Sequence, residues 1–204
     1  MKTYPLLVIL VFSLIACTPK QSIQNSSDSA EKAEAAYQIG KTAETQRKYA
    51  KAWQSLTLAT ELAPNNSLYL NDTGVLANFL GRYNKAIELL NKALDIDLKI
   101  LGPDHPIVAT SWSNLGHAWT NKREYEKAID YHEKSLASNL KTYGPDHPTV
   151  AINWNNLGGA WKEKRKYDQA REYFEKALAL FKKIGMEKYA QLVEENIRSL
   201  PPEK

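Results

Sequence analysis

Two stretches of the chain are nearly the same: GPDHPIVATSWSNLGHAW at Gly102–Trp119 and GPDHPTVAINWNNLGGAW at Gly144–Trp161. They lie 42 residues apart, and 23 of the 42 positions in residues 102–143 are identical in residues 144–185. Such a phrase either carries chemistry twice, for instance at His105 and His147, or marks a structural unit that occurs twice. The two interpretations predict different proteins.

The repeat continues upstream with a shorter step. Glycines recur at steps of 34, 42 and 42 residues, each followed nine residues later by Tyr and three residues after that by Ala. Self-similarity at this period is typical of helical solenoids. The composition agrees, because Ala, Leu, Glu and Lys are abundant and favour helix. The recurring glycines are Gly40, Gly74, Gly116 and Gly158.

The pattern resembles the tetratricopeptide repeat (TPR), a pair of antiparallel helices, and the 42-residue steps resemble the longer repeats of the kinesin light chain group. We therefore expect an all-α, right-handed solenoid of about four helix–turn–helix repeats over residues 31–185, with the extra residues of each long step including GPDHP. Small residues would let the paired helices approach closely, and Trp112, Trp119, Trp154 and Trp161 would be mostly core. The repeats are expected near 33–66, 67–100, 109–142 and 151–184.

The two ends of the array are also predicted. Apolar residues spaced by three and four over 186–200 indicate one amphipathic helix that caps the solenoid, and residues 201–204 form a tail that begins Pro-Pro. In the GPDHP loops, the Gly should end the preceding helix, Asp104 and Asp146 can cap the next helix, and the second Pro suits its first turn.

Residues 1–16 have the pattern of a signal peptide. Lys2 is followed by an apolar stretch, Leu6–Ala16, which is too short to span a membrane. Its end, LIAC, resembles the lipobox of bacterial lipoproteins, which implies that Cys17 is acylated after export. Because Thr18 and not Asp follows Cys17, the resemblance favours the outer membrane over the inner one. Residues 17–30 would be the lipidated Cys and a flexible polar tether, with a capping box at Asp28–Glu31 beginning the first helix.

The resemblance also implies a binding site. In TPR proteins the first helix of each pair lines a concave groove, and kinesin light chain repeats place Asn side chains there that hold an extended peptide by its backbone. An Asn amide both donates and accepts hydrogen bonds, so it suits such recognition; alternatively, these are ordinary exposed polar residues. The candidate groove residues are Asn71, Asp72, Asn78, Asn114, His117, Asn121, Asn155, Asn156 and Lys162.

Other function classes have little support. The formal net charge of +4 is scattered, which argues against nucleic-acid binding. His105 and His147 fall in successive loops without further ligands, so we expect no metal site. His132 stands where the other repeats carry apolar residues and should pack in the core. Because no catalytic or cofactor motif occurs, we expect no enzyme and no cofactor.

The sequence thus predicts a membrane-anchored TPR scaffold that binds a peptide segment or protein partner at the bacterial cell envelope. Two alternatives stay open. The array could instead self-associate as a structural envelope protein, or it could be an accessory scaffold for cell-wall enzymes.

Overall fold

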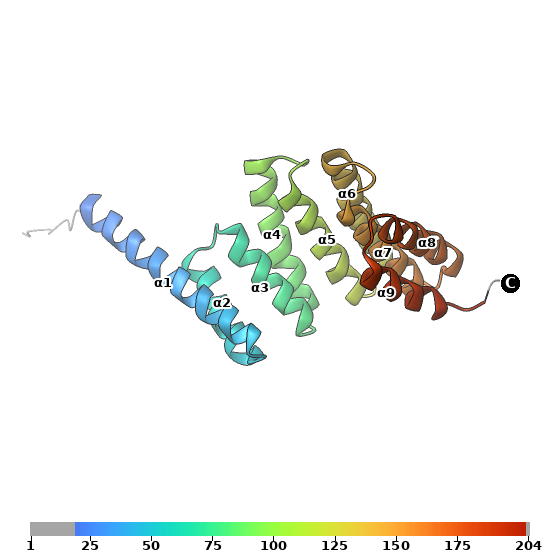
Figure 1. Ribbon diagram of the computed structural model, residues 1–204. Coiled ribbons are helices and arrows are strands. Elements are labelled where there is room, and N and C mark those ends of the chain that lie inside the picture. The colour runs from blue at the N-terminus through green and yellow to red at the C-terminus, as the bar shows by residue number, and fades with distance from the viewer. Residues whose placement is uncertain (1–18, 203–204) are drawn as a thin grey trace, which may run out of the picture.

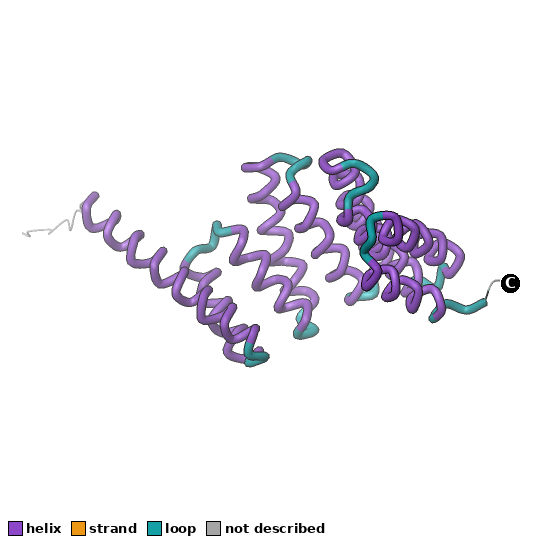
Figure 2. The backbone as a smooth tube through the Cα atoms, in the orientation of Figure 1, coloured by secondary structure: helices purple, strands orange, loops and turns teal. Residues whose placement is uncertain are grey.

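The computed structural model describes the backbone of residues 19–202 and the side chains of residues 28–202. The predicted signal peptide, the lipidation site at Cys17 and the last two residues of the tail lie outside the described residues. All regular structure between residues 19 and 202 is helical, as the repeat pattern predicted (Figures 1 and 2). Within that range, none of the helices combines the length and hydropathy needed to span a membrane. The helices are α1 (Pro19–Thr45), α2 (Tyr49–Leu62), α3 (Ser67–Phe79), α4 (Tyr83–Leu101), α5 (Pro106–Asn121), α6 (Tyr125–Tyr143), α7 (Pro148–Glu163), α8 (Tyr167–Lys183) and α9 (Glu187–Arg198).

The helices form a row of antiparallel pairs, α1/α2, α3/α4, α5/α6 and α7/α8, with α9 packed on the last pair. Each pair contacts only its neighbours, and the first helices of successive pairs also touch, since α3 contacts α5 and α5 contacts α7. Figure 1 shows these first helices side by side along one face of the array. The predicted solenoid of four repeats with a terminal helix is therefore confirmed.

Close helix packing explains the recurring glycines. A Cβ atom placed on Gly116 would lie 2.5 Å from Cε1 of His132, and one on Gly158 would lie 2.5 Å from Cδ1 of Phe174. The glycines of the first two repeats meet a leucine of the partner helix in the same way, at Gly40–Leu56 and Gly74–Leu90. Any side chain at these positions would push the two helices of a pair apart. The predicted close approach is confirmed, and His132 is buried as expected.

The extra eight residues of the long repeats lie in helices, not in the loop. The helix α4 is five residues longer than α2, with 19 residues against 14, and α5 is three residues longer than α3, with 16 against 13. The connecting loops 63–66 and 102–105 have equal length. The expectation that GPDHP is itself part of the insertion was wrong, because the loop replaces an equally short one and the added turns extend the helices beside it.

Histidine, not aspartate, caps the helices that follow the two GPDHP loops. The Nδ1 atom of His105 accepts a hydrogen bond from the backbone N–H of Ile107 at 3.2 Å, and Nδ1 of His147 accepts one from Thr149 at 3.3 Å. The prediction that Asp104 and Asp146 cap these helices was therefore wrong. Since the helices begin at the second Pro, the residue at the capping position is His, one position after Asp.

The two aspartates of these loops form ion pairs across the repeat. Asp104 pairs with Lys141 at the end of α6, and Asp146 pairs with Lys183 at the end of α8. The glycines preceding them, Gly102 and Gly144, have φ values of 80° and 81° and end α4 and α6, as predicted.

The first helix begins earlier than the sequence indicated. The backbone is helical from Pro19, so the expected flexible tether over residues 17–30 and the capping box at Asp28 were wrong for the described part. Asp28 instead lies inside α1 and pairs with Lys32 one turn later at 2.7 Å. Pro is favoured at the first helical position, and a helix already held by packing extends without a new nucleus. Figure 1 shows this first part of α1 projecting beyond the rest of the array.

The large aromatic residues and the last helix complete the core. Trp112, Trp119, Trp154 and Trp161 are half-buried and pack against clusters of buried aliphatic residues. The terminal helix α9 inserts Ala190 and Val193 into the cluster that contains Phe181, as expected for a cap. Its exposed residues include Glu187, Glu195 and Arg198, together with the apolar side chains of Tyr189 and Leu192.

Candidate functional site

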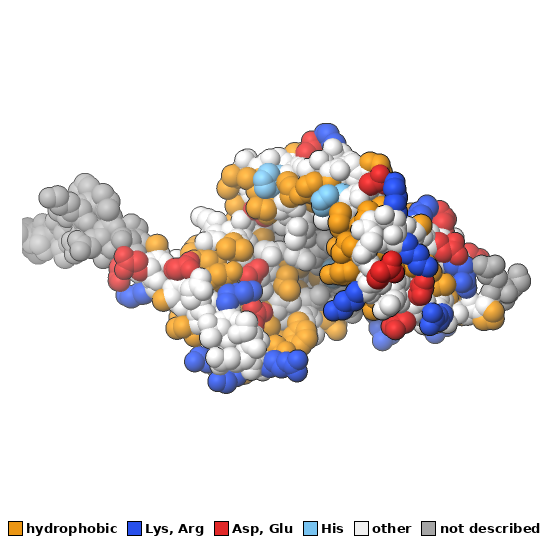
Figure 3. All heavy atoms as spheres, viewed as in Figure 1, with side chains coloured by type: hydrophobic (Ala, Val, Ile, Leu, Met, Phe, Trp, Pro, Cys, Tyr) orange, Lys and Arg blue, Asp and Glu red, His pale blue; other side chains and the backbone are white. Residues whose placement is uncertain are grey.

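The inner face of the array is formed by α1, α3, α5, α7 and α9. Figure 3 shows this face hollowed between α3 and α5 on one side and α7 and α9 on the other. The face is mixed in chemistry: exposed Leu68, Val75 and Phe79 lie along α3. The helices α5 and α7 present amides, hydroxyls and a few charges, with Ile152 as an exposed apolar side chain on α7. The candidate groove residues predicted from the sequence all belong to α3, α5 and α7.

A polar contact recurs at every junction between successive inner helices. In each case a side chain of one inner helix bonds to a side chain of the next, and three of the four contacts involve an Asn amide donor. We call this series the inter-repeat ladder. Its rungs are Tyr37 to Asp72 (2.7 Å), Asn114 to Asn71 (3.0 Å), Asn156 to Ser113 (3.3 Å) and Asn196 to Asn155 (3.1 Å).

The ladder gives the predicted groove amides a structural role. Asn71, Asn114, Asn155 and Asn156 are half-buried and bond to one another's helices. Each Asn side chain has two N–H donors and a carbonyl oxygen with two lone pairs, so a single rung leaves capacity for a further partner. The amides can therefore hold the array in register and still bind a ligand.

Further contacts on the inner face flank the ladder. Asn121 donates to Asn78 at 3.1 Å, and Lys162 donates to the Ser199 hydroxyl at 2.8 Å. At the N-terminal end, Lys41 pairs with Asp72 at 2.9 Å and with Glu44 at the same distance. These bonds connect α1 to α3, α3 to α5, and α7 to the segment that ends α9.

Two stacked tyrosines close the N-terminal end of the inner face, which sequence reasoning did not identify. The rings of Tyr37 and Tyr69 lie 4.5 Å apart, with Tyr37 donating to Asp72 and Tyr69 donating to Glu34. Burial and the Asp72 bond raise the pKa of Tyr37 to about 12. The bond to Glu34 is the main cause that raises the pKa of Tyr69, also to about 12.

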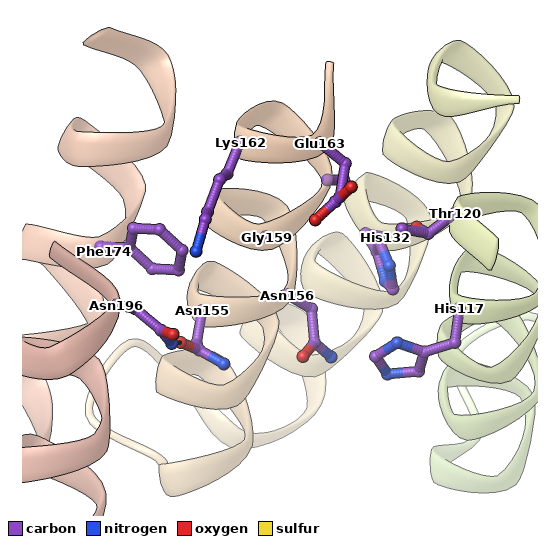
Figure 4. Close-up of a pocket in the computed structure, with 11 residues that line it drawn as sticks. His117, Thr120, His132, Asn155, Asn156, Gly159, Lys162, Glu163, Phe174 and Asn196 are labelled. Carbon is purple, nitrogen blue, oxygen red and sulfur yellow. Dashed lines mark hydrogen bonds between the residues drawn. The ribbon is translucent and has the colours of Figure 1, made fainter. Parts of the chain in front are cut away.

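A pocket of about 280 Å³ opens on the inner face between α5, α7 and α9 (Figure 4). Its rim carries four of the predicted groove residues, His117, Asn155, Asn156 and Lys162. The other five, Asn71, Asp72, Asn78, Asn114 and Asn121, do not line it. Sequence reasoning missed four further lining residues, Gly159, Ala160, Phe174 and Asn196, and named His132 only as a core residue.

Two histidines form one wall of the pocket. The rings of His117 and His132 meet edge to face with their centroids 5.0 Å apart. His132 is only 1% exposed, and its Nδ1 atom has no hydrogen-bond partner. Burial, assisted by the neighbouring His117, lowers the pKa of His132 to about 3. The side chain of His117 is exposed, but desolvation by the surrounding protein also lowers its pKa below the ordinary value. Both imidazole rings are therefore neutral at pH 7.

The described part of the chain contains no cluster of side chains that could bind a metal ion. Between residues 19 and 202, no group of three or more His, Cys, Asp or Glu side chains is arranged to hold a metal ion. His105 and His147 are engaged as helix caps, and the ring of His147 also stacks on Tyr143 at 4.2 Å. The inner face thus offers hydrogen bonding and apolar contact to a ligand.

Comparisons with known proteins agree with this architecture. One tetratricopeptide repeat family model matches residues 67–119 and 108–183, and a second model of the same description matches residues 33–66. No match was found among the curated proteins.

Solved structures show the same fold at low sequence identity. A Podosopora anserina putative kinesin light chain with nearly identical TPR-like repeats has a TM-score of 0.68 and 18% identity, covering 85% of this chain and 81% of that one. MamA from Desulfovibrio magneticus RS-1 has a TM-score of 0.62 and 20% identity, covering 81% and 86%. BtubC (BKLC) from P. vanneervenii has a TM-score of 0.57 and 21% identity, covering 91% and 94%.

Proteins built from these repeats are generally scaffolds for protein–protein interaction. The family models match most of the described residues. The structure agrees with them, because the helix pairs stack on one another and glycines allow the close packing within each pair. This chain therefore belongs to the tetratricopeptide repeat family.

Proposed function

We propose that the protein is a lipid-anchored scaffold that binds an extended segment of a protein partner on its inner face, at the bacterial cell envelope, and performs no chemistry of its own. The observation that carries the proposal is the series of side-chain amides that runs from α3 to α9 along one face. Backbone peptide groups of an extended segment need both donors and acceptors, and amides supply both without requiring a particular sequence.

Apolar surface on α3 supports the same face as the binding surface. Leu68, Val75 and Phe79 are 53%, 42% and 65% exposed, and their spacing of seven and four residues places them on one side of the helix. Exposed large apolar side chains gathered on one face are typical of interaction sites. A segment that crosses the inner face would bury these side chains at one end and meet amides along its length.

The anchor is supported by the residues that precede the array. An apolar stretch ending in LIAC, with Cys17 as the only cysteine of the chain, favours acylation over disulfide formation. The helix α1 has 27 residues, which corresponds to a length of about 40 Å. Since its first part projects beyond the array, it would act as a stiff spacer between the lipid and the binding surface.

Site-specific photo-cross-linking tests the binding surface. A photoreactive residue at Val75 on the inner face is compared with one at Lys92, which is exposed on the outer helix α4. Cross-links to envelope proteins that form at Val75 and not at Lys92 would support the proposal. Equal or stronger cross-linking at Lys92 would contradict it, and cross-links to a second copy of the chain at either position would favour self-assembly.

Metabolic labelling with an alkyne-tagged fatty acid tests the anchor. The wild-type chain should incorporate the label and sediment with membranes, whereas a Cys17→Ser variant should do neither. Label on the variant, or wild-type protein found in the soluble fraction without label, would contradict lipid anchoring. The result is independent of the cross-linking experiment, so the two parts of the proposal can fail separately.

A further inference from the structure

Gly159 is a glycine inside a helix with no packing reason to be glycine. It lies inside α7, four residues before the helix ends at Glu163, and a Cβ atom at this position would meet no neighbouring atom within 4 Å. Its neighbour Gly158 is different, because there a Cβ atom would collide with Phe174. Glycine is unfavourable in helix interiors relative to every residue except proline. The absence of a side chain at Gly159 therefore costs stability that packing does not explain.

The missing side chain keeps the pocket open. The equivalent inner-face residues, related by steps of 42, are Val75 on α3 and His117 on α5, and both project side chains. At Gly159 the same space belongs to the 280 Å³ pocket, as Figure 4 shows. Drug-sized ligands occupy cavities of about 300–1,000 Å³, so this one has the size for a single amino-acid side chain with its adjoining backbone.

The pocket offers both hydrogen-bond donors and acceptors without a net charge. Lys162 and Glu163 both line it. The Lys162 ammonium group donates to Ser199 at 2.8 Å and has two further N–H donors. Asn155 and Asn156 each retain donor and acceptor capacity beyond their rungs. At the wall, the buried Nδ1 atom of His132 has no partner, and an unsatisfied buried polar atom of this kind requires an explanation such as an absent ligand.

From these observations we infer that the pocket receives a primary carboxamide, the side chain of an Asn or Gln in the bound segment; the inference rests on the proposed binding of an extended segment. A carboxamide donates through its NH₂ group and accepts through its oxygen, so it can serve Glu163 and Lys162 at once. A carboxylate would meet the like charge of Glu163 as well as the opposite charge of Lys162, and an ammonium group would meet the reverse, so neither ion gains a net attraction from the pair. An aliphatic side chain would desolvate the polar lining without compensation.

Model peptides test this selectivity directly. Four capped heptapeptides with three alanines on each side of a central Gln, Glu, Lys or Leu are titrated into the ¹⁵N-labelled full chain. The Gln peptide should shift the backbone signal of Gly159 and the side-chain signals of Asn155 and Asn156. Since a net hydrogen bond corresponds to roughly a fivefold to tenfold change in affinity, the other three should bind at least about fivefold more weakly. Equal affinities, or no Gln-dependent shift at Gly159 at millimolar peptide, would overturn the inference.

Two substitutions at the same position make the test specific. Gly159→Leu should fill the pocket and abolish the preference for Gln, while Gly159→Ala should weaken it. Gly159→Ala should also raise the melting temperature by about 2–4 °C, so loss of binding cannot be assigned to unfolding. As a control outside the binding surface, Ala179→Leu adds bulk at an exposed position of the outer helix α8 and should leave the Gln preference unchanged within about twofold.

The outcomes separate this inference from the proposed function. If cross-linking at Val75 persists while the four peptides bind equally, or while Gly159→Leu retains the Gln preference, the inner face binds partners but the carboxamide pocket is wrong. If cross-linking at Val75 is also absent, the proposed function itself fails.

Discussion

Gly158 and Phe174 are in direct contact across the α7/α8 pair: a Cβ atom on Gly158 would lie 2.5 Å from Cδ1 of the Phe174 ring. The ring is 1% exposed and lies in the core cluster of the last repeat, so it has little room to move. The same relationship, with different large residues, sets the spacing within every helix pair of the array.

Alanine at the two adjacent glycines of α7 should therefore have opposite effects. Gly158→Ala should destabilise the fold by about 1–3 kcal/mol, because the methyl group forces the helices apart or the ring off its rotamer. Gly159→Ala should stabilise it by about 0.8–1 kcal/mol, because it removes the helix penalty of glycine in open space. Urea unfolding followed by circular dichroism measures both. A destabilised Gly159→Ala, or an unaffected Gly158→Ala, would contradict the packing described here.

The buried histidine of α6 should make stability depend on pH. The pKa of His132 is lowered to about 3 in the fold, against an ordinary value of about 6.5 in the unfolded chain. The unfolded state thus binds the proton more readily, so the contribution is fully present above about pH 6.5 and is lost as pH falls towards 3. At pH 5 the loss is about 2 kcal/mol.

Substituting His132 isolates this contribution. The His132→Phe variant introduces the residue that Phe174 supplies in the next repeat. Its unfolding free energy should fall by about 2 kcal/mol less than that of wild type between pH 7.5 and pH 5. Parallel pH profiles for wild type and His132→Phe would rule out the buried neutral histidine.

The rung between Asn71 and Asn114 should contribute measurably to stability. Asn114→Ala removes the donor of a 3.0 Å bond between half-buried groups and should cost about 0.5–1.5 kcal/mol. In a double-mutant cycle with Asn71→Ala, the coupling energy should be about 0.5–1 kcal/mol. A cycle between Asn71 and Asn196, which belong to different rungs, should give a coupling near zero. Zero coupling for Asn71 and Asn114 would mean that the amides are not bonded to each other in solution.

The tight turns inside three of the repeats place an arginine in the left-handed backbone region, and substitution by glycine should relieve this backbone strain. Arg47, Arg123 and Arg165 have φ values of 57°, 68° and 62°, while the equivalent residue of the second repeat is Gly81 with φ of 74°. A left-handed backbone disfavours residues with a Cβ atom by about 1–2 kcal/mol, partly offset by the greater entropy of unfolded glycine. Arg165→Gly should therefore stabilise the protein by about 0.5–1 kcal/mol. Thermal unfolding with Gly81→Ala as the opposite substitution, which should be destabilising, checks the assignment.

Spacing alone was sufficient to predict the repeat unit. Gly, Tyr and Ala recur at steps of 34 and 42 residues, and this recurrence identifies helix pairs. A close contact between two helices requires a small residue at the same position of every repeat. For the same reason the partner of each glycine could be predicted to be large, and the burial of His132 followed from the apolar residues at its equivalent sites.

The start of α1 and the caps were less predictable, because they depend on energies that local residue types do not fix. A polar segment such as residues 19–27 has no apolar periodicity, but it can extend a helix that is already stabilised by packing. His105 and His147 cap helices because the chain enters the helix at the following Pro, which sets the capping position one residue after Asp. The eight extra residues were likewise expected to include GPDHP, although they lengthen the helices beside that loop.

The sequence by itself determined the helix pairs and their order, since these follow from periodicity within segments of 34 or 42 residues, and the resemblance to TPR repeats implied that the recurring amides share one face. Only the tertiary structure decided what those amides do. The rungs join residues about 40 positions apart, and the pocket at Gly159 brings together side chains from five helices. Whether an amide bonds to its neighbour, to a ligand or to water depends on distances between helices, which are set by how the pairs stack and not by any single repeat.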